Sequence, residues 1–282
     1  MNYIFSYNVD NPHSDFSSRN YIASFCESLR RIEFDDKLVL FTESPDRLKP
    51  LVAGLDATLV PIQDITNRFH NDNCPLIPGL QDYSIKRLHV KKRYIQENAI
   101  DINDKILFID SRDAIFQTNP FNDASTPKLT FGEEHLPYIN DWSSPQFEMY
   151  KFDEPLYNSI MSHKGYAINA GVFMGSIKNY LNLIDDVTKD HLYVKSNISR
   201  VITKIPVCDQ IIINKLLIIN KLTYCNVLPH QNNFVINYLL DGSFTYVDNK
   251  VCVNNKPVSI VHQYDRTPDM LKLLLDQYAV QF

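Results

Sequence analysis

The stretch that decides the fold is residues 105–121, KILFIDSRDAIFQTNPF. Four consecutive apolar residues stand near its start, which is typical of a strand buried on both faces of a parallel sheet. Asp110 and Asp113 follow, separated by Ser111 and Arg112. In a continuing strand, residues three apart point to opposite faces, so the two carboxylates converge only if the chain turns between them. We therefore expect a strand that ends near Asp110 and a turn that brings both acids to one point.

The two acids permit two interpretations. Carboxylates that lie close together repel each other unless a proton or a cation neutralises them. A divalent cation with oxygen ligands does this, whereas Arg112 offers the simpler alternative of a turn held by a salt bridge. His262 stands in a second apolar, strand-like segment, SIVHQYDR (259–266). An imidazole added to two carboxylates makes a mixed site that suits Mn²⁺ and tolerates Mg²⁺. A histidine after a strand is also a common structural residue, so both interpretations stay open on the residues alone.

Upstream of this stretch, strand-like and helix-like patterns alternate. We expect strands at 2–8, 37–44 and 57–62, helices at 17–32 and 82–98, and a loop over 63–82. This alternation predicts an α/β fold with a mostly parallel central sheet flanked by helices. In such sheets ligands bind beyond the carboxyl ends of the strands, which is where Asp110 and Asp113 stand.

Downstream of residue 121 the alternation is less regular. We expect strands at 128–134 and 166–176, an irregular stretch between them, a helix from about residue 177, a second helix at 208–218, and late strands in TYCNVLP and SIVHQY. No internal repeat, low-complexity tract or linker is visible in the sequence. We therefore predict a single domain over residues 1–282.

Composition narrows the classes of function. The formal net charge is −5, so no basic surface for nucleic acid is indicated. The seven glycines form neither a dinucleotide-binding GxGxxG motif nor a P-loop. The five scattered cysteines favour reduced thiols over a disulfide framework or a zinc site. No apolar run has membrane-spanning length and the N-terminus does not resemble a signal peptide, so we expect a cytoplasmic protein without a transmembrane segment.

Five segments, in order, resemble landmarks of the GT-A nucleotide-sugar glycosyltransferases. The DSRD turn resembles their metal motif, in the DxxD form of the collagen- and lysyl-hydroxylase-type glucosyltransferase domains. LTFGEE (129–134) resembles the acid-bearing strand after that motif, and INAGVFMGS (168–176) resembles the Asn-Ser/Ala-Gly strand. CDQIIIN (208–214) resembles the Asp-Gln helix start, and IVHQYD (260–265) resembles the C-terminal strand whose histidine completes the metal site, as in glycogenin-like transferases. Two departures stand out: DSRD replaces the more usual DxD, and DRTPDM replaces the Lys-Pro-Trp-like segment of glycogenin-like members.

This resemblance implies a GT-A domain in which residues 1–121 bind nucleotide and metal and residues 122–282 bind sugar and acceptor. It implies a hexosyltransferase-type enzyme that moves a sugar from a nucleotide-diphosphate donor, expected to be a UDP-sugar, to a hydroxyl of a glycan or protein acceptor. Mn²⁺ or Mg²⁺ is the implied cofactor. The sugar, the stereochemical course and the oligomeric state stay open.

The resemblance also implies roles for individual residues. Metal coordination is assigned to Asp110, Asp113 and His262. Contacts with nucleotide, diphosphate and donor sugar are assigned to Ser6, Tyr7, Asn8, Arg87, Asp110, Ser111, Arg112, Asn169, Ala170 and Gly171. Candidate catalytic residues are Asp209, Gln210 and Glu133, with Glu134 beside it. Two of these have simpler interpretations, because KRLHVKKR around Arg87 is also typical of a solvated basic face and Asp209 is also what a helix start requires.

Two other classes of protein stay in view. A catalytically silent GT-A-like domain would bind glycan or act as a scaffold, and it would not need the three candidate metal ligands. A sugar nucleotidyltransferase typically carries a glycine-rich N-terminal loop, whereas YIFSYNVDNPHS has no glycine. Stabilisation by UDP with Mn²⁺ separates a transferase from a binder of free glycan, which responds to sugar alone.

Overall fold

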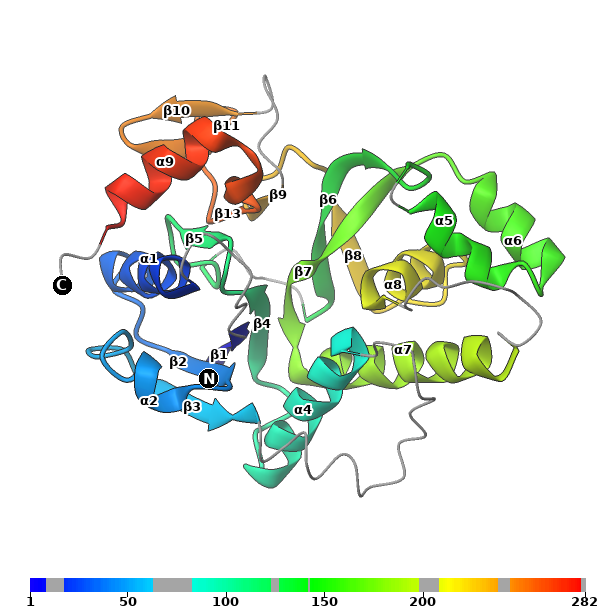
Figure 1. Ribbon diagram of the computed structural model, residues 1–282, viewed down its shortest axis with the longest axis horizontal. Coiled ribbons are helices and arrows are strands. Elements are labelled where there is room, and N and C mark those ends of the chain that lie inside the picture. The colour runs from blue at the N-terminus through cyan, green and yellow to red at the C-terminus, as the bar shows by residue number, and fades with distance from the viewer. Residues whose placement is uncertain are drawn as a thin grey trace.

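The computed structural model shows a mixed α/β fold in which helices flank a large, curled and mostly parallel sheet (Figure 1). The structure describes residues 1–8, 18–62, 83–122, 127–141, 143–197, 208–237 and 244–279. The loop expected over 63–82 lies outside these residues. Among the described helices, none combines the length and the apolar character that crossing a bilayer requires.

Ten strands of the described residues form the large sheet. Their bounds are β1 (Asn2–Asn8), β2 (Lys37–Thr42), β3 (Ala57–Pro61), β4 (Lys105–Asp110), β5 (Ala114–Phe116), β6 (Leu129–Pro137), β7 (Tyr166–Ser176), β8 (Cys225–Leu228), β9 (Val235–Asn237) and β13 (Ile260–His262). The order is β3-β2-β1-β4-β7-β6-β9-β13-β5, with β8 also paired to β6. A small antiparallel sheet contains β10 (Thr245–Val247), β11 (Lys250–Val253) and β12 (Lys256–Pro257).

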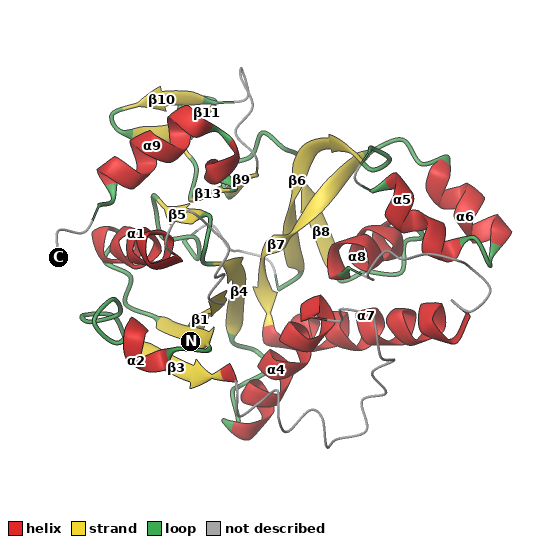
Figure 2. Cartoon of the chain, in the orientation of Figure 1, coloured by secondary structure: helices red, strands yellow, loops and turns green. Residues whose placement is uncertain are grey.

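Most strand pairs of the large sheet are parallel. Strands β1 to β4 run parallel, and so do the pairs β6–β8, β6–β9 and β9–β13. β7 is antiparallel to both of its neighbours, and β5 is antiparallel to β13. In Figure 2, β7 lies between β1–β4 on the left and β6 and β8 on the right. The carboxyl ends of β1, β2 and β4 therefore lie at the same edge of the sheet, and β4 is the strand that pairs with β7.

Helices cover both faces of the sheet. Their bounds are α1 (Ser18–Arg31), α2 (Pro45–Leu48), α4 (Tyr83–Glu97), α5 (Ser144–Phe147), α6 (Glu154–Met161), α7 (Ile177–Asn197), α8 (Asp209–Ile218) and α9 (Pro268–Gln277), with short 3-10 helices at Glu148–Tyr150 and Tyr264–Arg266. Helices α4, α7 and α8 pack on the face that carries Phe5, Phe41, Phe108 and Phe173. Helices α1 and α2 pack on the opposite face, which carries Ile4, Leu40, Leu107 and Val172. Strand alternation thus places successive apolar residues of β1, β2 and β4 in two separate cores.

The structure confirms the predicted α/β class with a mostly parallel sheet flanked by helices. The expected strands 2–8, 105–110 and 166–176 match β1, β4 and β7, because each is a near-continuous apolar run. The stretch expected to be irregular contains α5 and α6, which are short and begin with prolines. The sequence also gave no signal for β5 or for the small sheet, whose strands are only two to four residues long.

One core residue is a lysine. The side chain of Lys91, on α4, is fully buried, and its Nζ lies 3.5 Å from the centre of the Phe108 ring. Nζ has no hydrogen-bond partner among the described residues. Burial, together with the nearby charge of Arg87, lowers the pKa of Lys91 well below its ordinary value. The core therefore tolerates this amine at a cost that rises when the amine is protonated.

We predict that Lys91→Met raises the free energy of unfolding by about 1–3 kcal/mol, because it removes a buried amine without a hydrogen-bond partner. Since the pKa of Lys91 is lower in the folded chain than in the unfolded chain, the unfolded chain binds the extra proton. Wild-type stability therefore gains from this lysine as pH rises towards the ordinary lysine pKa. The advantage of the variant should shrink between about pH 7 and about pH 9, which urea unfolding at both pH values measures.

Lys92→Met is the matched control. Lys92 is the next residue of the same helix, and it forms a surface ion pair with Asp185. Its replacement should change the free energy of unfolding by no more than about 0.5 kcal/mol. A Lys91→Met protein less stable than wild type, beside an unchanged Lys92→Met protein, would contradict the prediction.

Candidate active site

The DSRD turn and the C-terminal strand are neighbours in space. β5 follows the turn and pairs antiparallel with β13, so that His262 stands opposite Ala114. The backbone N–H of Gln263 donates to the carbonyl oxygen of Asp113 over 2.8 Å. The imidazole Nε2 of His262 lies 3.4 Å from Oδ1 of Asp113. A histidine from near the end of the chain thus contacts an acid from its middle.

Asp110 reaches the same place because β7 carries a glycine there. A Cβ atom at Gly171 would lie 2.8 Å from Oδ2 of Asp110 and 2.9 Å from Cε1 of His262. The missing side chain allows both groups to approach the β7 backbone. The structure therefore brings Asp110, Asp113 and His262 together, although the described residues contain no group of three His, Cys, Asp or Glu side chains arranged to hold a metal ion.

The imidazole of His262 is held in one orientation by Asn237. Nδ2 of the fully buried Asn237 donates to the carbonyl oxygen of Gly132 over 3.2 Å, so its Oδ1 faces Nδ1 of His262 at 2.9 Å. In the neutral imidazole, Nδ1 then carries the proton and the Nε2 lone pair is on the side of Asp113. Burial lowers the pKa of His262, but the carboxylate of Asp113 and those of Asp110 and Glu134 raise it overall.

The pKa of the Asp113 carboxyl group is lowered, whereas that of His262 is raised. The burial of Asp113 raises its pKa, but the neighbouring His262, and more weakly Arg112 and Arg266, lower it overall. The two side chains therefore stabilise each other in their charged forms.

A buried arginine joins the turn to α8. Nη1 of Arg87 lies 3.0 Å from Oδ1 of Asp110, and Nη2 lies 2.9 Å from Oδ2 of Asp209. The guanidinium also lies over the Phe108 ring, 5.2 Å from its centre. Burial lowers the pKa of Arg87, but Asp209 and Asp110 raise it overall. Only 14% of the arginine side chain and 4% of the Asp209 side chain are exposed, so Arg87 does not belong to a solvated basic face.

A network of amides surrounds a second acid. Oε1 of Glu134 accepts from Nδ2 of Asn169 over 2.6 Å, and Oε2 accepts from Nε2 of Gln210 over 3.4 Å. Oδ1 of Asn169 accepts from the backbone N–H of Gly171 over 2.6 Å, and Oε1 of Gln210 accepts from that of Ala170 over 3.4 Å. Burial raises the pKa of Glu134, against the opposing hydrogen bond from Asn169.

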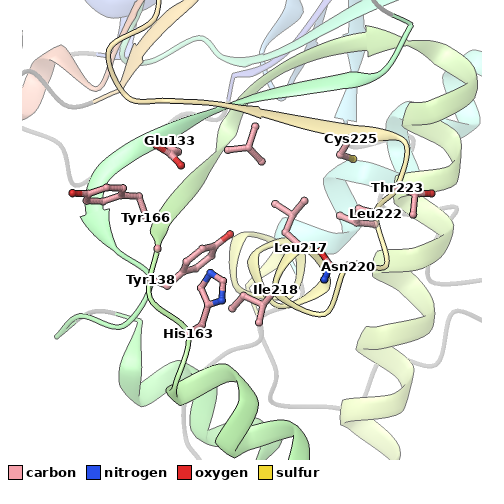
Figure 3. A pocket seen from close by; sticks show the side chains of 12 residues that line it. Glu133, Tyr138, His163, Tyr166, Leu217, Ile218, Asn220, Leu222, Thr223 and Cys225 are labelled. Carbon is pink, nitrogen blue, oxygen red and sulfur yellow. The ribbon is translucent and has the colours of Figure 1, made fainter.

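Of the two neighbouring glutamates, the structure places Glu134 in this network, whereas the predicted Glu133 lines a pocket together with Tyr138 and His163 (Figure 3). The pairing of β6 with β7 has register shifts on both sides of Glu133, so alternation along the strand did not reveal which acid faces the site. Of the other catalytic candidates, Asp209 is held by Arg87, and its Oδ1 also accepts from the N–H of Gln210 over 2.9 Å.

Two of the predicted nucleotide contacts are serines whose hydroxyls bond to neighbouring strands. The hydroxyl of Ser6 donates to the carbonyl oxygen of Ile109 over 2.7 Å, and that of Ser111 donates to the carbonyl oxygen of Tyr7 over 3.2 Å. Both serines are buried. Their hydroxyls join β1 to the end of β4.

Of the other predicted nucleotide contacts, Tyr7 is buried and Arg112 lies at the surface. The ring of Tyr7 stacks on Phe41 with ring centres 6.3 Å apart, and only 9% of Tyr7 is exposed. The side chain of Asn8 lies outside the described residues. Arg112 points to the surface and donates to Asp265 over 2.8 Å, so the salt bridge that the sequence suggested forms with a carboxylate beyond the turn.

A scan against protein-family models and a search of curated proteins each give no match to this chain.

We predict that Gly171→Ala lowers the free energy of unfolding by about 1–3 kcal/mol, because a methyl group there overpacks a fixed site. Besides Asp110 and His262, it would meet Oδ1 of Asn169 at 2.9 Å. Gly165→Ala is the control, since its methyl group would mainly meet the partly exposed side chain of His163, which can move. Thermal unfolding without added metal measures both variants, and equal stability of the two would contradict the assignment.

We predict that Arg87→Met costs about 3–5 kcal/mol of stability, because it leaves the buried carboxylate of Asp209 without its cation. The double variant Arg87→Met/Asp209→Asn should recover much of this loss, since asparagine carries no charge. Arg112→Met is the exposed control and should change stability by at most about 1 kcal/mol. Urea unfolding compares the three proteins. If the double variant is no more stable than Arg87→Met, the charge of Asp209 is not the cause.

Proposed function

We propose that this chain is a metal-dependent glycosyltransferase of the GT-A type, which moves a sugar from a nucleoside diphosphate, expected to be UDP, to a hydroxyl acceptor. The observation that carries the proposal is the meeting of Asp110, Asp113 and His262 beyond the carboxyl end of β4. Parallel sheets typically bind ligands at this edge. The mixed α/β fold and the order of the five sequence landmarks support the same assignment.

The residues at this place fit a hard divalent cation in their chemistry. Nε2 of His262 is buried, and apart from the contact with Oδ1 of Asp113 at 3.4 Å it has no hydrogen-bond partner among the described residues. Asn237 supplies the outer partner that metal-bound histidines typically have. Asp110 and Asp113 would add carboxylate oxygens, which together with one imidazole suit Mn²⁺. A bound ion would supply Lewis-acid stabilisation of the charge that develops on a departing diphosphate.

The protein's own side chains would orient the reacting groups. Arg87 fixes the carboxylates of Asp110 and Asp209 relative to each other. Asn169 and Gln210 hold the β7 backbone and Glu134 together, and this fixed surface would lie against the donor sugar. Preorganised polar groups of this kind lower a barrier because they need no reorganisation during the reaction.

Glu134 is the candidate proton acceptor. A transfer that inverts the anomeric centre needs a carboxylate to accept the proton of the acceptor hydroxyl. Glu134 is only 6% exposed, and the upward shift of its pKa makes it a stronger base than an ordinary glutamate. In a retaining transfer, its part would be limited to holding Asn169 and Gln210.

We predict that wild type releases nucleotide from at least one UDP-sugar in the presence of Mn²⁺, and that excess chelator stops this. Asp113→Asn and His262→Ala should lower the rate by more than about 100-fold, because each removes a metal ligand. Asn237→Ala should weaken Mn²⁺ binding by about 10–100-fold through the orientation of His262. Nucleotide release over a panel of nucleotide sugars measures the first effect, and electron paramagnetic resonance of added Mn²⁺ measures binding directly.

Asp185→Asn is the control, because Asp185 is a surface acid of α7 paired with Lys92. It should keep both Mn²⁺ binding and turnover. Full turnover in chelator, or no Mn²⁺ binding by wild type, would overturn the proposal. Stabilisation by a free glycan without nucleotide turnover would favour a silent glycan-binding domain.

A further inference from the structure

A pocket lies beside the part of β6 that carries Glu133. It has a volume of about 410 Å³, which is at the small end of the range for ligand pockets. The ends of β6, β7 and α8 and part of β8 form its walls (Figure 3). Two successive residues of β6 connect this pocket with the candidate active site. Glu133 lines the pocket, and Glu134 belongs to the amide network of the candidate active site.

The walls combine aromatic and apolar surface. Leu217, Ile218 and Leu222 form an apolar side. Tyr138 and His163 pack edge to face, with ring centres 4.8 Å apart. Tyr166 also lines the pocket and is 46% exposed. Such surfaces suit the flat, weakly polar face of a ring-shaped ligand.

The polar groups of the pocket include the carboxylate of Glu133, the phenols of Tyr138 and Tyr166 and the imidazole of His163. Figure 3 shows the side chains of Glu133, Tyr138 and His163 around the same space. Burial raises the pKa of Glu133, against a hydrogen bond from the backbone of His230. No lysine or arginine is among the described residues that line the pocket. The carboxylate is therefore an acceptor that a ligand with hydroxyl donors satisfies.

These features select among classes of ligand. An anion would meet the carboxylate of Glu133 without a compensating cation. A purely apolar ligand would bury the Glu133 carboxylate with only the hydrogen bond from the backbone of His230 to satisfy it. A cationic amine would pair with Glu133, but it carries no acceptor for the N–H groups of Asn220 or the O–H of Thr223, both of which line the pocket. A sugar ring presents an apolar face and a rim of hydroxyl groups, and so uses all of these surfaces.

We propose that this pocket binds an uncharged saccharide ring. Its identification as part of an acceptor glycan, remote from the reacting hydroxyl, rests on the proposed function. Leu217 in the pocket and Asp209 near the active site stand eight residues apart on α8, which is about 12 Å along the helix. This separation favours an oligosaccharide acceptor over a monosaccharide.

The test is saturation-transfer NMR on the full chain without metal or donor. The probes are glucose, galactose, lactose and maltotriose, with glucuronate as the anionic counterpart and Nα-acetyl-lysine amide as the cationic one. At least one neutral saccharide should bind saturably below about 10 mM. Tyr166→Ala and Glu133→Gln should each weaken this binding by about tenfold or more, because they remove an aromatic surface and a charged acceptor.

Two control variants make the result specific. Tyr157→Ala removes a partly exposed tyrosine of α6 and should leave saccharide binding unchanged, with melting temperatures confirming that both tyrosine variants fold. Asp113→Asn should also leave saccharide binding unchanged. Saccharide binding by a wild-type chain that shows no turnover of any nucleotide sugar would count against the proposed function alone. The pocket proposal is overturned if no neutral saccharide binds up to about 10 mM, if binding survives both pocket substitutions, or if only the lysine derivative binds.

Discussion

The antiparallel pairing of β5 with β13 is the constraint on which the candidate active site depends. It consists of three residue pairs, and the N–H of Gln263 extends it to the carbonyl oxygen of Asp113. Gln263 has a φ of 57°, a left-handed conformation that a residue with a side chain adopts at a cost. The turn at Gln263 ends β13 directly after His262, so the imidazole stands at the end of the strand, against Asp113.

Charge compensation explains how the fold tolerates the acids of the candidate site. Arg87 contacts Asp110 and Asp209 at once, and His262 lies against Asp113. Each of these three aspartates thus has a positively charged or protonatable neighbour. Arg87 lies over the Phe108 ring, and His262 is held by the amide of Asn237. Burial would otherwise make such a concentration of carboxylates unfavourable.

The sequence predicts well those features whose signal lies within a few consecutive residues, such as buried strands. Apolar runs reveal β1, β4 and β7, because such a signal lies within a few residues of the chain. The roles of Ser6 and Ser111 depend on which strand lies beside which, and that of Asn237 depends on the register of β9 with β13. The choice between Glu133 and Glu134 depends on irregular pairing of β6 with β7. Strand neighbours, strand register and irregular pairing leave no periodic pattern in a single sequence.

The order of the strands has a consequence for biosynthesis. A ribosome makes β5 long before β13, since the two are separated by most of the second half of the chain. Until β13 emerges, β5 lacks the partner that the finished sheet gives it, and unpaired edges of this kind favour aggregation or chaperone capture. Folding of this region can therefore be completed only after translation has passed residue 262, so the nascent chain must delay closure of the sheet rather than fold strictly from its N-terminus.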